Sequence, residues 1–346
     1  IVSEGATLNI DSGVVVRFQA NQGMVISGSL DAYKCTFRSD ASTQNEGDWS
    51  EIGIGTAGIA GTADFYGCVI EYGGRSTTND SYGMVVVERG TVNFDGDCEI
   101  RHSNNAGILV GTYGTIHLSR TVISGNSKPV VYTGPGSVLL HQGNAFIGNA
   151  TDIIYLNFSQ STNNFVLDTA SVPYEFSGIY TIAGGTMEIL SGNEMRMNSS
   201  LRIRGGILNA YYTTFTSAES PQASGDWDEI EVGYASTSGE ASFWGCTIEY
   251  GGHASASLDY AMVMVNNGTA GFYDNCVIRM SNNAGIRVAS AGNVNLTNSS
   301  ITDNTYPLIY AGPGSVVLNG INNLTGNSED VMLINFSENT NTFVLD

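Results

Sequence analysis

The stretch Ser103-Asn104-Asn105-Ala106-Gly107 recurs unchanged as Ser281-Asn282-Asn283-Ala284-Gly285, at an offset of 178 in the numbering. The same offset joins Trp49 to Trp227, and from about residue 30 onward the two copies align without a net gap. A repeat this regular indicates that both copies meet the same structural demands. A residue that the fold or a repeated site requires should therefore occur twice, which separates required residues from incidental ones.

A shorter period runs inside each copy. In the first copy Asn104, Asn126 and Asn149 each stand four positions before an apolar residue that opens a strand-like run. Coils of about 22–24 residues with short strands and a turn asparagine predict a β-solenoid. Because stacked coils lie about 4.8 Å apart, we expect equivalent asparagines to form a hydrogen-bonded ladder. The second copy repeats the spacing with Asn282, Asn304 and Asn327.

The composition supports an all-β fold. The apolar residues fall in short β-branched runs such as Met84-Val85-Val86-Val87, and no stretch keeps the 3.6-residue apolar period of an amphipathic helix. A column of small residues also recurs, each two positions before a large apolar residue, and we interpret its cysteines as buried free thiols. The column contains Cys35, Cys68, Cys98, Thr121 and Ala145 in the first copy and Cys246, Cys276 and Ser299 in the second.

The formal net charge is −20, although only 13% of the residues are charged. Basic groups are scarce and scattered, which argues against nucleic acid and anionic membranes as partners. No run of 18 apolar residues is present, so we expect no membrane insertion. High net charge of one sign aids solubility outside cells, and we expect Ile1 to follow a removed segment.

The opening of the first copy resembles a known family. Residues 5–18, followed by Gly28-Ser29-Leu30-Asp31-Ala32, are similar to the first coils of pectate-lyase-like parallel β-helices that repeat in large prokaryotic secreted and cell-surface proteins. The turn asparagines and Gly47-Asp48-Trp49 fit the same pattern. The resemblance covers the whole chain and implies a right-handed parallel β-helix with an Asn ladder and an extracellular or cell-surface location.

We expect two tandem units, 1–168 and 179–346, which repeat at the offset of 178 and are joined by a short junction at 169–178. The junction carries aromatic residues and is flanked by strand-like runs, so the solenoid should continue through it. Solenoid ends normally need caps, and neither end of the sequence offers one. The expected partners are therefore further repeats of the same chain, or copies of it stacked end to end.

The repeat argues against catalysis, because no histidine role is repeated. His102, His117, His141 and His253 correspond to Met280, Asn295, Asn319 and Arg75 in the other copy. The resemblance to polysaccharide lyases implies a basic residue close to calcium-binding carboxylates, and no repeated cluster of that kind is evident. We expect no catalytic residue, no metal and no cofactor, with calcium at Asp48 and Asp226 as an alternative.

Carboxylates beside aromatic residues do recur, and two long turns at about residues 38–48 and 73–81 should gather them into one lobe on each copy. Aromatic faces stack on sugar rings, so the lobe is a candidate site for glycans or cations. The alternative is that Trp49 and Trp227 merely cover core that a long turn would expose. The candidate residues are Asp48, Trp49, Glu71, Tyr72 and Tyr82, with Asp226, Trp227, Glu249, Tyr250 and Tyr260 in the second copy.

The sequence thus predicts an extracellular, non-enzymatic structural or adhesive repeat protein, as part of a surface fibre, sheath or large tandem-repeat adhesin. The alternative is a carbohydrate-binding or polysaccharide-degrading β-helix that acts through the lobe. The fold alone does not decide between them, because function depends on sites placed on the scaffold.

Overall fold

The computed structural model describes residues 1–336, except for the side chain of Ser290. Among these residues there are strands and turns but no α-helix, which confirms the all-β prediction. Each strand pairs in parallel with a strand one coil away, as β4 (Ser29–Tyr33) does with β7 (Gly61–Tyr66). This arrangement is that of a β-solenoid. The end of the expected second unit, residues 337–346, lies outside the described residues.

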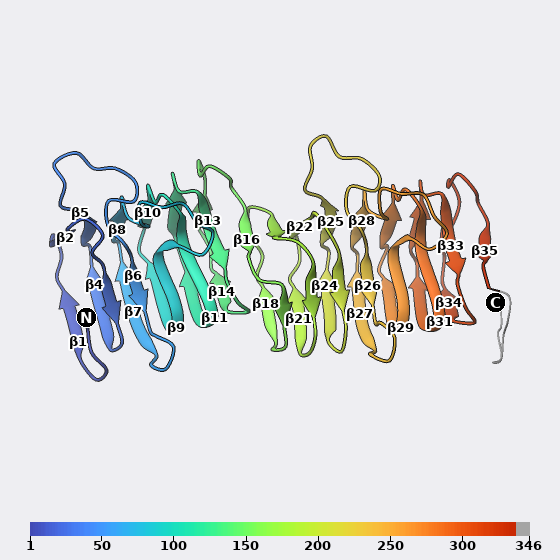
Figure 1. Ribbon diagram of the computed structural model, residues 1–346, viewed down its shortest axis with the longest axis horizontal. Coiled ribbons are helices and arrows are strands. Elements are labelled where there is room, and N and C mark those ends of the chain that lie inside the picture. The colour runs from blue at the N-terminus through green and yellow to red at the C-terminus, as the bar shows by residue number, and fades with distance from the viewer. Residues whose placement is uncertain (337–346) are drawn as a thin grey trace. The chain divides into compact units, whose positions relative to one another are not determined.

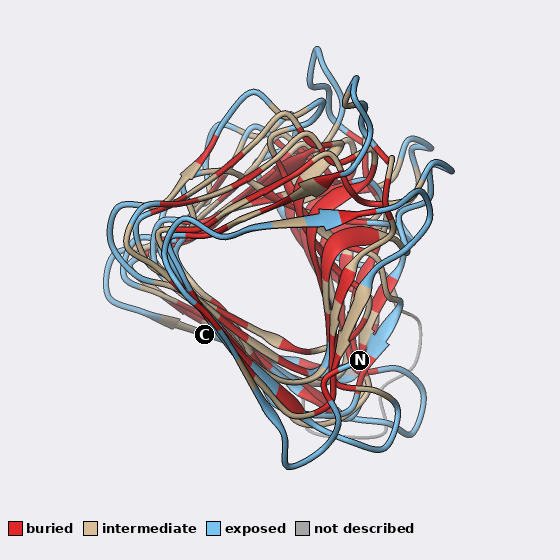
Figure 2. Cartoon of the chain, turned by 90° about the vertical axis from the view of Figure 1, so that its left-hand side faces the viewer, coloured by how far each residue is buried: buried red, intermediate tan, exposed pale blue. Residues whose placement is uncertain are grey.

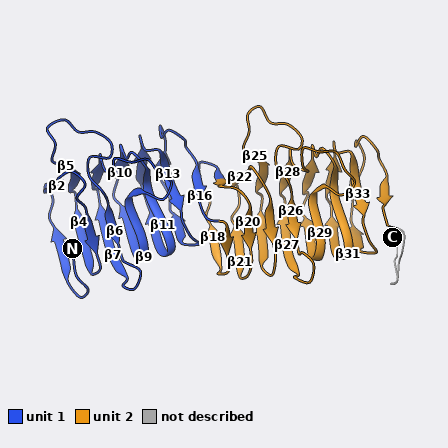
Figure 3. Cartoon of the chain, viewed as in Figure 1, with its two compact units in different colours: residues 1–158, 170–174 blue, residues 159–169, 175–346 orange. Residues whose placement is uncertain are grey.

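The chain divides into two compact units (Figure 3). The first comprises residues 1–158 and 170–174, and the second comprises 159–169 and 175–336 of the described chain. The expected junction, 169–178, contains one strand, β19 (Tyr174–Phe176).

The strands are short, three to six residues in most cases, and in each unit they lie side by side with their turns at the two edges (Figure 1). Within residues 1–158 the bounds are β1 (Thr7–Ile10), β2 (Val15–Phe18), β3 (Met24–Ile26), β4 (Ser29–Tyr33), β5 (Thr36–Ser39), β6 (Ile52–Ile54), β7 (Gly61–Tyr66), β8 (Val69–Glu71), β9 (Gly83–Asp95), β10 (Cys98–Arg101), β11 (Ala106–Leu118), β12 (Thr121–Ser124), β13 (Lys128–Tyr132), β14 (Ser137–Leu140), β15 (Ala145–Phe146) and β16 (Ile154–Leu156).

The later strands repeat this pattern. Their bounds are β17 (Gln160–Ser161), β18 (Phe165–Leu167), β19 (Tyr174–Phe176), β20 (Tyr180–Ile182), β21 (Thr186–Ile189), β22 (Glu194–Met197), β23 (Leu201–Ile203), β24 (Ile207–Tyr211), β25 (Thr214–Ser217), β26 (Ile230–Val232), β27 (Gly239–Trp244), β28 (Thr247–Glu249), β29 (Ala261–Tyr273), β30 (Val277–Arg279), β31 (Ala284–Thr297), β32 (Ser300–Thr302), β33 (Tyr306–Tyr310), β34 (Ser315–Asn319) and β35 (Met332–Ile334).

Each coil of a unit has three sides, and the buried residues line the inside (Figure 2). In the first unit β1, β4 and β7 form one side, β3 and β6 form the second, and β2, β5, β8, β10 and β12 form the third. The long strands β9 and β11 each cross a corner and contribute to two sides.

The core consists of inward side chains that stack on their counterparts one coil away. On one side Ile54 lies opposite Val87, which lies opposite Val110, and all three are fully buried. Phe65 stacks on Phe94 with ring centroids 4.9 Å apart. Burying each such side chain contributes roughly 1.5–3 kcal/mol, so the stacked columns supply most of the stabilisation.

The cysteines are buried and free in both units, as the sequence indicated. Cys68 lies between Cys35 and Cys98, and burial raises the pKa of its thiol to about 12. The predicted column fails at its last member in the first unit. Val122 pairs with Ala145, so Ala145 stands one position beyond the column, and the inward residue is Phe146 rather than the exposed Ile147.

The expected Asn ladder is present with two corrections. The backbone N–H of Asn126 donates to Oδ1 of Asn149 at 3.0 Å, and Asn126 in turn accepts from the N–H of Ser103 at 2.9 Å. The column therefore keeps an even step and begins at Ser103, not at Asn104. Asn104 lies outside the ladder, and its Nδ2 donates to the Arg75 carbonyl at 3.1 Å.

The second unit has the same ladder. The N–H of Ser281 donates to Oδ1 of Asn304 at 2.9 Å, and the N–H of Asn304 donates to Oδ1 of Asn327 at 3.2 Å. Asn282 again lies outside, where its Nδ2 donates to the Ala254 carbonyl at 2.9 Å. The ladder fixes turns that would otherwise leave backbone N–H groups unpaired.

Two corners rely on glycine. Gly90 lies in β9 with φ of 118°, and a Cβ there would overlap the carbonyl oxygen of Gly61 on the neighbouring coil. Gly268 in β29 has φ of 131° and the same relation to Gly239. Where β9 and β29 turn the corner, any other residue would therefore clash with the neighbouring coil. It would also have to adopt a left-handed backbone conformation, which glycine tolerates best.

Replacing Gly90 by Ala should lower the free energy of unfolding by about 2 kcal/mol or more, because it combines backbone strain with overlap of main-chain atoms. Gly58→Ala is the matched control, since a Cβ at Gly58 meets nothing within 4 Å. Urea unfolding of both variants measures the difference, and equal midpoints would contradict this account of the corner.

Asn126→Ala should cost about 1–3 kcal/mol of unfolding free energy, because the N–H of Ser103 and the Ile100 carbonyl lose a buried partner. Asn104→Ala should cost much less, since Asn104 lies outside the ladder. Thermal unfolding followed by circular dichroism compares the two variants. A larger loss of stability in Asn104→Ala than in Asn126→Ala would contradict this correction and favour Asn104 as the ladder residue.

Candidate functional site

Two long turns in each unit lie against each other at one corner. The first joins β5 to β6 and the second joins β8 to β9. The N–H of Gly47 donates to the Gly73 carbonyl at 3.0 Å, and that of Gly74 donates to Ser50 at 2.8 Å. Equivalent bonds join the turns after β25 and β28. The longest of these turns rise above β5 and β25 in Figure 1. The two turns therefore form the expected lobe in each unit.

The two tryptophans of the lobe are core residues. Trp49 is 0% exposed, stacks on Phe18 with centroids 4.4 Å apart, and donates its Nε1–H to the Glu71 carbonyl at 2.9 Å. Trp227 is 1% exposed and makes the same bond to Glu249. Neither ring is accessible to a ligand, so this placement supports the structural alternative and removes both residues from the expected binding surface.

The two glutamates of the lobe form ion pairs with arginines of the same unit. Glu71 is buried, and its Oε2 accepts from Nε of Arg101 at 2.9 Å. Glu249 is bound by Arg279 in the same way at 2.8 Å. A buried carboxylate needs such a partner, since an unpaired buried charge is very costly.

The two aspartates of the lobe also bond to its backbone. Oδ2 of Asp48 accepts from the N–H of Asn45 at 2.9 Å. Oδ2 of Asp226 accepts from the N–H of Ala223 and from the hydroxyl of Ser217, both at 2.7 Å. These bonds close the first long turn of each unit.

The four tyrosines of the lobe remain half-buried. Tyr72 stacks on His102 with centroids 5.1 Å apart, and Tyr82 lies under the Arg75 guanidinium at 4.5 Å. In the second unit Tyr260 stacks on His253, the counterpart of Arg75, at 4.0 Å. Tyr250 has a left-handed backbone, with φ of 64°. Like Asp48 and Asp226, the tyrosines are candidate residues that keep partial contact with solvent.

A buried asparagine, absent from the candidate residues, holds the second long turn. Asn105 donates Nδ2 to the carbonyls of Gly74 and Thr77 and accepts from the N–H of Asn79 at 2.6 Å. Asn283 repeats this role, accepting from Ser257 at 2.7 Å. The signal was available in the sequence, because both residues belong to the repeated Ser-Asn-Asn-Ala-Gly stretch.

One position of the lobe differs chemically between the units. Glu51 accepts two bonds from Arg75, from Nε at 2.6 Å and from Nη2 at 2.7 Å. In the second unit His253 replaces Arg75, and Glu229, the counterpart of Glu51, instead accepts from the Ser200 hydroxyl at 2.9 Å. Burial raises the pKa of Glu229, and the neighbouring carboxylates add to this effect.

Beside Glu229 the second unit carries an ion-pair cluster that the first unit lacks. Glu231 is 5% exposed and accepts from Nε of Arg204 at 2.9 Å, while Arg202 lies 3.7 Å away. Nδ2 of Asn266 adds a bond at 3.1 Å. Gly53 occupies the position of Glu231 in the first copy. Because its partners enclose Glu231, this carboxylate is not placed to act on a substrate.

No metal centre is formed by three or more His, Cys, Asp or Glu side chains in residues 1–336. The closest histidine pair, His117 and His141, has Nδ1 and Nε2 3.5 Å apart, and burial lowers the pKa of His117. Asparagines replace both histidines in the second copy, so this pair is not a repeated site.

The two units allow opposite effects from the same substitution. Glu51→Gln should lower the unfolding free energy by about 0.5–1 kcal/mol at pH 7, because Arg75 loses its charged partner but is exposed enough for water to replace part of the interaction. Glu229→Gln should raise it, because a partly buried carboxylate, whose charged form is penalised by desolvation, is replaced by a neutral amide.

The pH dependence follows from the raised pKa of Glu229. Between its unfolded value near 4.5 and its higher folded value, the folded chain holds more protons, so stability falls as the pH rises. Glu229→Gln should remove that part of the fall. Chemical unfolding from pH 4 to 8 tests this, and a loss of stability in both variants would contradict the assignment.

Comparison of the chain with protein-family models, curated proteins and solved structures finds no match. Among the residues that the structure describes, no helix has the length and apolar character needed to cross a membrane. The fold and the site geometry are therefore the basis for assigning a function.

Proposed function

We propose that the chain is an extracellular structural or adhesive repeat, a right-handed, pectate-lyase-like parallel β-helix of two tandem units that repeat at the offset of 178, without enzymatic activity. One observation carries the proposal: the polar residues that recur in both copies bond to their own scaffold. Glu71 and Glu249 bind arginines, Asn126 and Asn304 fix turns, and the repeated tryptophans are buried.

A repeated site for chemistry would leave at least one repeated ionisable group facing solvent beside a second one. In both lobes the carboxylates are instead bonded to arginine, hydroxyl or backbone partners. What the two copies share is the support of a rigid, regular surface. Such a surface suits a fibre, a sheath or the stalk of an adhesin, with further units of this kind following in the same assembly.

A second candidate, carbohydrate binding, is favoured by an outward row of aromatic rings. Tyr211 stacks on Trp244 at 4.8 Å and Trp244 on Tyr273 at 5.6 Å, and all three are partly exposed. Tyr33 and Tyr66 form the equivalent pair in the first unit at 5.3 Å. The proposal ranks second because Trp244 has a ring against each face, which leaves less of it for a sugar.

The purified chain should associate into linear assemblies as its concentration rises. Light scattering measures the mass and electron microscopy the form of the particles. A monomer at all concentrations would contradict end-to-end association.

Two variants test the other functions. Activity on polysaccharides that is lost in Glu229→Gln would contradict the non-enzymatic role. Glycan binding that is lost in Trp244→Ala would favour the second candidate.

A further inference from the structure

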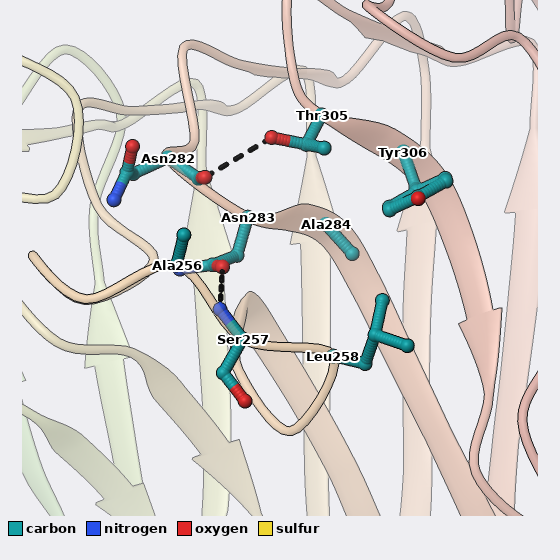
Figure 4. A pocket seen from close by; sticks show the side chains of 8 residues that line it. All are labelled: Ala256, Ser257, Leu258, Asn282, Asn283, Ala284, Thr305 and Tyr306. Carbon is teal, nitrogen blue, oxygen red and sulfur yellow. Dashed lines mark hydrogen bonds between the residues drawn. The ribbon is translucent and has the colours of Figure 1, made fainter.

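The second unit has a pocket of about 190 Å³ on its outer surface, and the second long turn of the lobe forms part of its lining (Figure 4). Asn283 and Ala284 form its floor, and the side chains of Leu258 and Tyr306 stand on two sides of it. Ala284 is also buried in an apolar cluster with Ala261 and Ile309, and Tyr306 packs against this cluster. The residues that line the pocket are Ala256, Ser257, Leu258, Asn282, Asn283, Ala284, Thr305 and Tyr306.

The polar groups around this pocket are already paired with one another. The Thr305 hydroxyl donates to the Asn282 carbonyl at 3.0 Å, and the Ser257 N–H donates to Oδ1 of Asn283 at 2.7 Å (Figure 4). Nδ2 of Asn283 donates to Ser255 at 3.0 Å. The pocket therefore offers apolar surface and few free hydrogen-bonding groups, so it favours an uncharged, apolar occupant over a sugar.

In the first unit an ion pair occupies the position that corresponds to the pocket. Asp80 and Lys128 stand at the positions of Leu258 and Tyr306, and Nζ of Lys128 lies 2.6 Å from Oδ1 of Asp80. The Lys128 side chain is only 15% exposed, with its Nζ 4.7 Å from the centroid of Tyr155. An ion pair thus joins the two walls in the first unit. The second unit has a leucine and a tyrosine at these positions, neither of them charged, and therefore no such bridge.

The size of the pocket limits its occupant. An internal cavity of about 150 Å³ accepts a benzene ring, whereas sites for small-molecule ligands usually measure about 300–1,000 Å³. At about 190 Å³ the pocket fits one aromatic side chain. A free ring would stay partly in water there, so the rest of the contact must come from a larger partner.

The exposed charge around the pocket is negative. Asp259 follows Leu258 and its side chain is 78% exposed, and Glu329, whose N–H donates to the Thr305 carbonyl, is also exposed. The nearby cation is Arg287, which is 16% exposed and lies 3.9 Å from Asp259. No lysine occurs after Lys128 in the sequence. A cationic partner meets this rim favourably.

We propose that the pocket binds a partner polypeptide by one aromatic side chain that is flanked by lysine or arginine. Leu258 and Tyr306 pack on the ring, Ala284 lies beneath it, and Asp259 and Glu329 attract the flanking cations. This contact belongs to the second unit alone, and it does not depend on whether the chain forms fibres.

The test uses two acetylated and amidated peptides, Gly-Lys-Lys-Phe-Lys-Lys-Gly and the same sequence with Ala in place of Phe. Calorimetry with the whole chain should show the Phe peptide binding at least about tenfold more tightly, as expected for burial of one aromatic side chain. Equal affinities would overturn the proposal, because charge alone would then explain the binding.

The decisive variant is Leu258→Asp with Tyr306→Lys, which installs the pair found in the first unit. It should abolish the preference for Phe while circular dichroism remains unchanged. Tyr306→Ala should reduce the preference and serves as the second variant if the double one fails to fold. Tyr113→Ala, at a 59% exposed tyrosine of the first unit, should leave it intact.

Two further outcomes would overturn the proposal. The first is a Phe preference that survives both the double variant and Tyr306→Ala, which would place the ring elsewhere. The second is binding of free toluene as tight as that of the Phe peptide, which would make this a small-molecule site. Weaker binding of the peptide with Glu in place of each Lys supports the role of the acidic rim.

Discussion

The parallel hydrogen bonds between successive coils are the constraint on which the rest of the molecule depends. They hold each strand at a fixed register to the strand one coil away, so every side chain has its structural counterpart as a neighbour. Inward positions must therefore accept a copy of their own kind, as Ile54 does with Val87 and Phe65 with Phe94. The turns must in addition supply partners for backbone groups that leave the ladders, as Asn126 does for the N–H of Ser103 and Asn304 for that of Ser281.

The sequence predicted those features that follow from stacking. The all-β fold, the parallel coils and the ladder asparagines are regular in the chain because neighbouring coils demand similar residues. Asn104 was assigned wrongly to the ladder because adjacent asparagines share nearly the same spacing, and only the coil register shows that Ser103 occupies the column. Trp49 illustrates a further limit. An aromatic residue beside a long turn looks the same in sequence whether it faces a ligand or, as here, closes the core.

The two units also show where a solenoid is free to change. Inward positions differ little between copies, while outward ones differ in charge and size. Asp80 and Lys128 give way to Leu258 and Tyr306, and Gly53 gives way to Glu231. An outward side chain contacts only its neighbours on the surface and does not enter the stack. Sites that distinguish one unit from the other therefore arise on the outside, and a repeat comparison finds them as departures from the shared pattern.

The corners have a consequence for how such a chain can change in length. Five residues separate Phe18 from Met24 in the first unit, and three separate the corresponding Met197 and Leu201. Two residues lie between β3 and β4, and three between β23 and β24. The strands themselves keep their register, since one residue inserted in a strand would turn its inward side chains outward. Insertions and deletions are thus confined to turns, and a foreign loop grafted at a corner would leave the stacked core unchanged.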